Sequence, residues 1–274
     1  MRWFKRHKTP PKKTIKIQDK YRPSGTIIPT NNSPLKIAVV AHIFYKNIAE
    51  EILGYLDNIH HDLDIYVSTR PEMKDHVEAI LKNKKHIRKA VVYGVENKGF
   101  DIGPFLSGPV SDYYKYDIIC KIHSKKNTAG SPLDGWQEYL LKNVMGSEKI
   151  VREIMDRFHE DGSLGILYPE TFPAAVELIG NERWGKNWAT CEQLSKKIGL
   201  ETTRDLEFDF PSGSIFWFRP KALKPLFDLG LKMDDFEASR GDIDDGTLAH
   251  AIERFFVLAA AKEGFSHKKV LFTC

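Results

Sequence analysis

The sequence predicts an α/β fold, in which a mostly parallel, Rossmann-like sheet carries helices on both faces. Two observations support this prediction. Short runs rich in β-branched residues alternate with segments whose apolar residues recur at helical spacing. The alternation begins near Lys36 and continues through most of the chain, as is typical of parallel sheets with helical crossovers. A length of 274 residues with 42% hydrophobic content can supply the core of such a domain.

The first part of the chain is expected to begin with a βαβ unit. The expected strands are 36–44, 64–68, 90–93 and a run through Ile118, Ile119 and Ile122. The expected helices are 47–59, 71–84 and one more segment before Ile118. Because these strands follow helices at regular spacing, we expect them to be parallel neighbours in one sheet.

The second part of the chain continues the alternation with longer intervals. We expect a helical region at 136–158, strands at 165–168 and 214–218, and a helix at 246–262 that closes the domain. Between them lies an aromatic-rich stretch around Trp184 and Trp188. We therefore divide the chain into a tail and linker, 1–34, and one domain, 35–274.

The tail is strongly basic and the domain is not. Residues 1–34 contain nine Lys or Arg and one acid, a net charge of +8, so the remaining residues carry −4. A mildly acidic domain argues against a broad nucleic-acid-binding face. Trp3 and Phe4 lie among the first cations, which suits an anionic membrane surface. A disordered, solubilising tail explains the same composition.

No run of about 18 apolar residues and no apolar signal-peptide core is present in the sequence. We expect a cytoplasmic location, with the basic tail allowing peripheral contact at the inner face of the plasma membrane. Cys120, Cys191 and Cys274 are scattered, without a paired spacing. We interpret them as free thiols and expect no metal site built on them.

The strongest local signal is a cationic cluster at the end of the Ile118 strand, namely Lys121, His123, Lys125 and Lys126. Ligands of parallel sheets bind beyond the carboxyl ends of the strands. His42 and Tyr45, which follow the first strand, should lie at the same edge. These residues therefore predict an anion site suited to a diphosphate. The alternative is an ordinary exposed strand end.

The segment from Asn97 to Phe105 follows the third strand and carries Gly99 and Asp101. Glycines allow a ligand to approach the backbone closely, and an aspartate accepts hydrogen bonds from a nucleobase or ribose. We therefore add Asn97, Gly99 and Asp101 to the donor side of the site. The alternative is a strand-to-helix turn in which Asp101 caps the following helix.

Five segments in order resemble the rhamnan synthesis protein F family of bacterial polysaccharide glycosyltransferases. They are His42–Tyr45, Asn97–Phe105, Lys121–Lys126, Pro211–Pro220 and Gly246–Arg254. The resemblance implies a glycosyltransferase A fold. It also implies transfer of a sugar, rhamnose being one candidate, from a nucleotide-sugar donor. The acceptor would be a growing cell-surface polysaccharide or lipid-linked glycan.

Many enzymes of that fold hold a divalent cation with a DxD motif after the fourth strand. This chain has His123, Ser124 and Lys125 there instead. Cationic side chains can supply the same countercharge to a leaving diphosphate. Our hypothesis is that Lys121, His123, Lys125 and Lys126 replace the metal. We therefore assign no metal ligand, and a dependence on Mg²⁺ or Mn²⁺ stays open.

Transfer with inversion needs a carboxylate that accepts the proton of the acceptor hydroxyl. Asp244 and Asp245 precede a predicted helix, as the catalytic base does in related folds, and we favour Asp245 slightly. The alternative is a helix cap with solvated acids. For the acceptor side we propose Trp184 and Trp188 as stacking surfaces, with His250 and Glu253 on one helix face.

Two other functions compete with a glycosyltransferase. The first is a non-catalytic nucleotide- or glycan-binding module of the same fold, which the missing DxD motif favours. The second is a phosphotransferase that uses the same cationic strand end, but the sequence contains no Gly-x-x-x-x-Gly-Lys-Ser/Thr loop.

Overall fold

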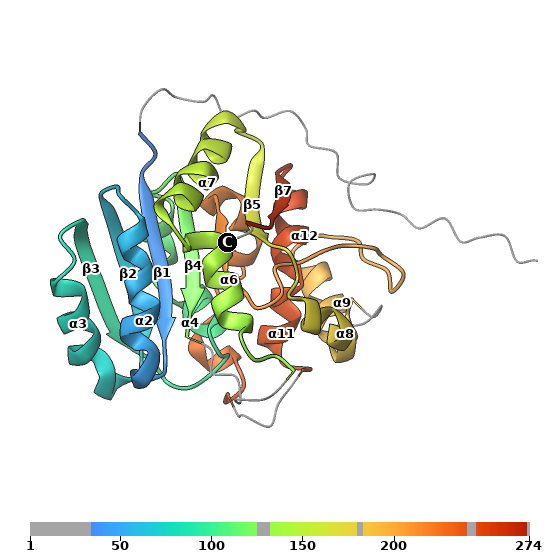
Figure 1. Ribbon diagram of the computed structural model, residues 1–274. Coiled ribbons are helices and arrows are strands. Elements are labelled where there is room, and N and C mark those ends of the chain that lie inside the picture. Colours follow the sequence, from blue (N-terminus) through green and yellow to red (C-terminus); the bar gives the residue numbers. More distant parts are fainter. Residues whose placement is uncertain (1–33, 125–131, 180–182, 240–244, 273–274) are drawn as a thin grey trace, which may run out of the picture.

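The computed structural model describes residues 34–124, 132–179, 183–239 and 245–272. Its strands form one seven-stranded sheet in the order β3-β2-β1-β4-β6-β5-β7 (Figure 1). The strands are β1 (Ile37–Ile43), β2 (Leu63–Thr69), β3 (Ile87–Gly94), β4 (Ile118–His123), β5 (Leu164–Pro169), β6 (Phe216–Phe218) and β7 (Ser266–Val270).

The predicted α/β class with a mostly parallel sheet is confirmed. β1 pairs in parallel with both β2 and β4, β2 with β3, and β5 with β7. β6 runs antiparallel to its two neighbours, β4 and β5. Of the seven described strands, β6 alone therefore points in the opposite direction, and its first residues lie at the edge where the other strands end.

Helices cover both faces of the sheet. The α-helices are α2 (Ala49–Gly54), α3 (Lys74–Lys82), α4 (Ile102–Ser107), α5 (Val110–Tyr113), α6 (Trp136–Met145), α7 (Glu148–Glu160), α8 (Pro173–Ile179), α9 (Trp188–Lys197), α10 (Lys224–Phe227), α11 (Leu248–Glu253) and α12 (Phe255–Lys262). The 3-10 helices are η1 (Lys46–Ile48), η2 (Tyr55–Asn58), η3 (Pro71–Met73), η4 (Gly185–Asn187), η5 (Pro220–Leu223) and η6 (Met233–Asp235).

The alternating side chains of β1 show how the sheet divides the core. Ala38 and Val40 join one apolar cluster, which includes residues of α4, α11 and α12. Ile37, Val39 and Ala41 join the other, which includes residues of α2, α3, α6 and α7. Because successive side chains of a strand point to opposite faces, a strand between two helical layers is apolar throughout. This explains the unbroken apolar run of β1.

Several predicted boundaries are corrected by the structure. The region 136–158 is two helices, because Ser147 caps the second by accepting a hydrogen bond from the Ile150 amide at 3.3 Å. The strand expected at 214–218 covers three residues only, since Ser214 has a left-handed backbone. The helix expected at 246–262 is divided into α11 and α12, with Arg254 between them.

The prediction that a helix closes the domain is wrong, because β7 follows α12 and pairs with β5 at the edge of the sheet. Its sequence, Ser266–Val270, is polar apart from the buried Val270. Such a strand gives no apolar alternation, and its place depends on the backbone pairing with β5. No helix in the described part of the chain has the length and apolarity needed to cross a bilayer.

Candidate functional site

The carboxyl ends of three parallel strands meet at one point. His42 of β1 lies opposite Ser68 of β2 on one side and opposite His123 of β4 on the other. The N-terminal end of β6 reaches the same edge because that strand runs in the opposite direction, with Phe216 opposite Lys121. The predicted meeting of His42 and His123 is confirmed, since strand register alone places them side by side.

His42 is a buried imidazole, and the direction of the Ser68 hydrogen bonds assigns its tautomer. Its Nδ1 lies 2.9 Å from the Ser68 hydroxyl oxygen, and the Ser68 hydroxyl donates to the Ala41 carbonyl oxygen at 3.3 Å. The Ser68 oxygen therefore accepts from Nδ1–H, which leaves Nε2 as a hydrogen-bond acceptor. The pKa of His42 is lowered from 6.5 to about 4, mainly by burial; the charge of Asp101 opposes this shift, and His123 and Lys121 add to it.

This shifted pKa gives a prediction for stability. Because the folded pKa lies below the unfolded value of 6.5, the unfolded chain binds a proton first as pH falls. The contribution of His42 to the free energy of unfolding is fully present above about pH 6.5. It should decrease by about 2–3 kcal/mol between pH 7 and pH 4.5. In His42→Gln this part of the pH dependence should disappear, as measured by urea unfolding at both pH values.

His61→Gln is the matched control for this measurement, since it removes an exposed imidazole where His42→Gln removes a buried one. Equal pH dependence in wild type and His42→Gln would show that the ring of His42 can be protonated in the folded protein near its ordinary pKa.

Asp101 and Lys121 form a buried ion pair beside His42. The Lys121 side chain is 1% exposed and that of Asp101 is 14% exposed. The ammonium donates to Asp101 Oδ2 and, at 2.9 Å, to the Ser214 carbonyl oxygen. His123 Nε2 lies 4.0 Å from the same carboxylate. Burial alone would raise the pKa of Asp101, but His123 and Lys121 outweigh it and hold the pKa well below its ordinary value.

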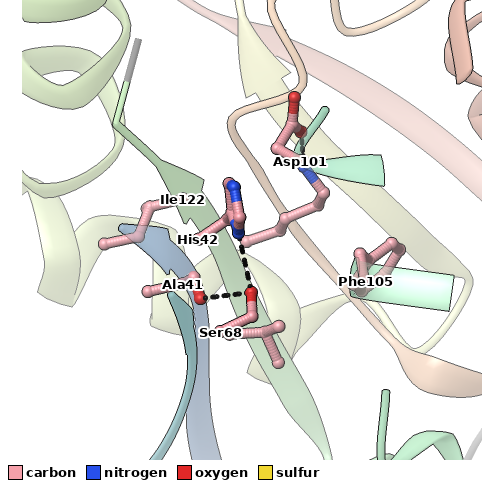
Figure 2. A pocket seen from close by; sticks show the side chains of 8 residues that line it. Ala41, His42, Ser68, Asp101, Phe105 and Ile122 are labelled. Atoms are coloured by element: carbon pink, nitrogen blue, oxygen red, sulfur yellow. Dashed lines mark hydrogen bonds and ion pairs between the residues drawn. The ribbon is translucent and has the colours of Figure 1, made fainter. Parts of the chain in front are cut away.

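These side chains surround a small pocket (Figure 2). Its empty space is about 160 Å³ with open solvent included, whereas pockets that enclose small ligands span roughly 300–1,000 Å³. The pocket by itself is therefore smaller than one that encloses a small ligand. The lining residues are Val40, Ala41, His42, Ser68, Asp101, Phe105, Lys121 and Ile122.

The structure changes the interpretation of Lys121. We expected it to meet a diphosphate directly, but its ammonium is buried against Asp101 and the rings of Phe105 and Phe216. An inward-pointing lysine on a strand with helices on both faces can reach solvent only past these groups. Lys121 is thus the partner of Asp101 in the structure. Lys125 and Lys126 lie outside the described residues, and their role stays a prediction.

The loop after β3 is held by the chain segment that follows η6. The Gly99 amide donates to the Glu237 carbonyl at 2.9 Å, and the Asn97 side chain donates to the Ser239 carbonyl at 3.1 Å. Gly99 has a φ of +64°, and a Cβ there would lie 2.6 Å from the ring of Phe236. Gly99 is therefore required by packing within the chain, whereas we had expected it to give room to a ligand.

Asp101 does not cap α4 with its side chain, contrary to the alternative we considered. The carboxylate turns to Lys121 instead, and the preceding residue, Phe100, has a left-handed backbone with a φ of +52°. Ser214, whose carbonyl accepts from Lys121, has a φ of +54°. Lys121 thus contacts Ser214 and the residue after Phe100, and Phe100 and Ser214 are the two left-handed positions that are not glycine among the described residues. Such positions concentrate at functional sites.

Tyr45 lies beside the site but contacts it through the backbone. The Ser124 hydroxyl accepts from the amides of Phe44 at 2.7 Å and Tyr45 at 3.4 Å, which joins the end of β1 to the end of β4. The ring of Tyr45 packs edge-on against Phe44, 5.1 Å between centroids. Ser68 and Ser124 were not among the predicted site residues, although Ser68 ends a predicted strand and Ser124 follows one.

Asp245 is bound on several sides by its own chain. Its carboxylate accepts from the Asn187 side chain at 2.6 Å and the Lys186 amide at 3.0 Å, and Arg254 lies 3.2 Å away. Burial would raise its pKa, but the Asn187 and Lys186 hydrogen bonds and the charge of Arg254 lower it. A carboxylate held in this way joins η4 to the start of α11. Asp244 lies outside the described residues.

The four residues proposed for an acceptor have different surroundings. Trp184 is buried, with its ring 4.4 Å from that of Phe208 and its Nε1 donating to the Thr203 carbonyl at 3.2 Å. It is a core residue, because Phe208 from a later segment packs against its ring, and the expected stacking surface is not available there. Trp188 is half-buried, and Arg204 lies over its ring.

His250 and Glu253 are closer to the pocket. The ring of His250 lies 5.1 Å from that of Phe100, and its Nδ1 contacts the Thr247 hydroxyl at 2.8 Å. Glu253 accepts hydrogen bonds from Gly213 and Ser214, whose carbonyls in turn contact the β4 side chains. Among the described residues, no group of three or more His, Cys, Asp or Glu side chains is arranged to hold a metal ion. Metal dependence stays a prediction.

Comparison with known proteins identifies the family. The model of the rhamnan synthesis protein F family matches residues 14–265. The chain belongs to this family. The match covers strands β1 to β6, ends just before β7, and confirms the resemblance seen in the five sequence segments. His42, Asp101 and His123 lie within the matched residues.

Two curated relatives are similar over most of the chain. Both are the uncharacterized protein WxcX of Xanthomonas campestris pv. campestris, from two strains, 33% identical over 229 residues. The match covers 82% of this chain and 31% of each relative, so the chain spans about a third of the length of these relatives. The solved structure of mouse xyloside xylosyltransferase 1 in its apo form matches at a TM-score of 0.40 with 11% identity. It covers 86% of this chain and 85% of that chain.

Proposed function

We propose that this member of the rhamnan synthesis protein F family is a nucleotide-sugar-dependent glycosyltransferase of the glycosyltransferase A type. The observation that carries the proposal is the convergence of His42, Ser68, Asp101 and His123 at the carboxyl ends of β1, β2 and β4, next to the first residues of β6. This edge is where α/β sheets bind nucleotides and other ligands. Membership of a family named for rhamnan synthesis supports a sugar as the transferred group.

The pocket offers hydrogen-bond acceptors to a ligand. His42 Nε2 and the Asp101 carboxylate both accept, so they suit hydroxyl groups or the N–H of a nucleobase better than phosphate oxygens. We therefore assign the ribose or base of the donor to this pocket. The diphosphate is assigned to the end of β4, because Lys125 and Lys126 follow His123 closely in the sequence. These assignments keep the hypothesis that cations replace a metal there.

Thermal-shift screening against UDP, dTDP, GDP and CMP sugars, with and without Mg²⁺ or Mn²⁺, tests donor binding. A ligand at about 100 times its dissociation constant should add roughly 2.7 kcal/mol to the free energy of unfolding. Lys125→Ala should weaken the best ligand in isothermal titration without lowering the melting temperature of the free protein. Unchanged affinity in both Lys125→Ala and Lys126→Ala would exclude the diphosphate site, and binding that requires a divalent cation would exclude replacement of the metal.

A non-catalytic nucleotide- or glycan-binding module remains the second candidate, because the chain has His123, Ser124 and Lys125 where a DxD motif would stand. Slow hydrolysis of a bound donor distinguishes the two without knowledge of the acceptor. Donor binding with no hydrolysis above the protein-free rate would favour the module.

The same proposal includes the transferred sugar, the acceptor and the position of the protein in the cell. We infer that rhamnose is the transferred sugar and that the acceptor is a growing cell-surface polysaccharide or lipid-linked glycan. The basic segment 1–34, with its net charge of +8, suits a peripheral position at the cytoplasmic face of an anionic membrane. The rhamnan synthesis protein F family model begins within this segment, at residue 14.

A further inference from the structure

The turn that precedes β6 has an unusual backbone. Gly213 has a φ of +87°, and Ser214 follows with a φ of +54°. A Cβ at residue 213 would lie 2.5 Å from a methyl group of Leu140, so glycine is required there. Ser214 has a side chain, and a left-handed residue that is not glycine is disfavoured. The turn therefore needs contacts that hold it in this conformation.

Glu253 supplies those contacts from one side. One carboxylate oxygen, Oε1, accepts from the Gly213 amide at 2.8 Å and from the Ser214 hydroxyl at 3.1 Å. The side chain is 16% exposed, so these hydrogen bonds are largely shielded from water. Glu253 is the last residue of α11 and lies 40 residues after Gly213 in the sequence. The bonds thus join two distant parts of the chain.

His123 and Lys121 of β4 contact the other side of the same turn. His123 Nε2 donates to the Gly213 carbonyl oxygen at 2.7 Å, and Lys121 donates to the Ser214 carbonyl oxygen at 2.9 Å. Both carbonyl oxygens would move if the turn changed its backbone conformation. Lys121 then continues to Asp101, the carboxylate that lines the pocket. The orientation of His123 and of the Lys121–Asp101 pair therefore depends on the turn.

We propose that Glu253 is a positioning residue, which holds the Gly213–Ser214 turn so that its carbonyl oxygens orient His123 and Lys121 for donor binding. The proposal deepens the proposed function and rests on it, because it assigns a role in the same donor site. It also replaces the expected position of Glu253 on the acceptor side. Its carboxylate faces backbone and hydroxyl donors of the turn, and it acts on the donor through His123 and Lys121.

The first test needs no donor. In ¹⁵N-histidine-labelled wild type, the Nε2 proton of His123 should exchange slowly because it is bonded to Gly213, and His123→Gln assigns its signal. Glu253→Ala should lose this slowly exchanging proton. Glu253→Gln should keep it, since the amide oxygen still accepts two hydrogen bonds. Retention of the signal in Glu253→Ala would overturn the proposal. If Glu253→Ala does not fold, Ser214→Ala removes one of the two bonds and should speed the exchange about tenfold.

The second test measures the dissociation constant of the nucleotide sugar that stabilises wild type most. Glu253→Ala should weaken it by about tenfold or more, and Glu253→Gln should stay within about twofold. Glu263→Ala, at an exposed residue after α12, is the control and should match wild type. Equal loss in Glu253→Ala and Glu253→Gln would overturn the positioning role. If wild type binds no nucleotide sugar, the proposed function fails, while the exchange of the His123 proton still decides the role of Glu253.

Discussion

Asp101→Ala should lower the free energy of unfolding by about 3–5 kcal/mol, because it leaves the ammonium of Lys121 buried without its carboxylate. Lys121 is 1% exposed, and its remaining hydrogen bond to the Ser214 carbonyl leaves its charge uncompensated. Urea unfolding at pH 7 measures the loss. Asp228→Ala, which breaks an exposed contact with Lys224, is the control and should leave the free energy of unfolding close to that of wild type.

A double variant separates the cost of a buried charge from the cost of a lost contact. Asp101→Ala combined with Lys121→Met removes both charges and leaves an apolar chain between Phe105 and Phe216. Its stability should recover most of the loss, since an apolar replacement of a buried pair is often neutral. The interpretation fails if Asp101→Ala alone stays within about 1 kcal/mol of wild type, which would mean that the ammonium reaches water.

Asp244→Asn should reduce donor hydrolysis by about 100- to 10,000-fold while leaving the donor dissociation constant within about twofold, if Asp244 is the catalytic base. The sequence slightly favours Asp245 for this role. The surroundings of Asp245 support its neighbour instead, because its carboxylate already accepts from Asn187 and Lys186 and contacts Arg254. A carboxylate with a lowered pKa is a weaker proton acceptor.

Asp245→Asn is the matched variant. It keeps an oxygen for the Asn187 contact but loses the charge beside Arg254, so we expect a loss of about 1–2 kcal/mol in unfolding free energy with turnover reduced far less. A loss of turnover in Asp245→Asn with normal turnover in Asp244→Asn would return the base to Asp245. Near-normal turnover in both variants would place the base elsewhere.

The sequence by itself determined the first four strands of the sheet and the edge at which they end. β1 is buried on both faces, so its apolar run identifies a strand between two helical layers whatever the rest of the chain does. Because parallel strands end at one edge, the residues that follow them had to meet, and His42 and His123 do so in register. The family resemblance was also carried by segments that can be read directly in the sequence.

The tertiary structure decided what those residues contact. The sequence places Lys121 in a cationic cluster at the end of a strand. The carboxylate that pairs with it, Asp101, comes from the loop after β3. Glu253 lies 40 residues from Gly213, and Trp184 is covered by Phe208 from a later segment. The local sequence indicates which strand or helix carries a side chain. It does not indicate which distant carboxylate or ring packs against that side chain, and these partners determine its charge state, burial and pKa.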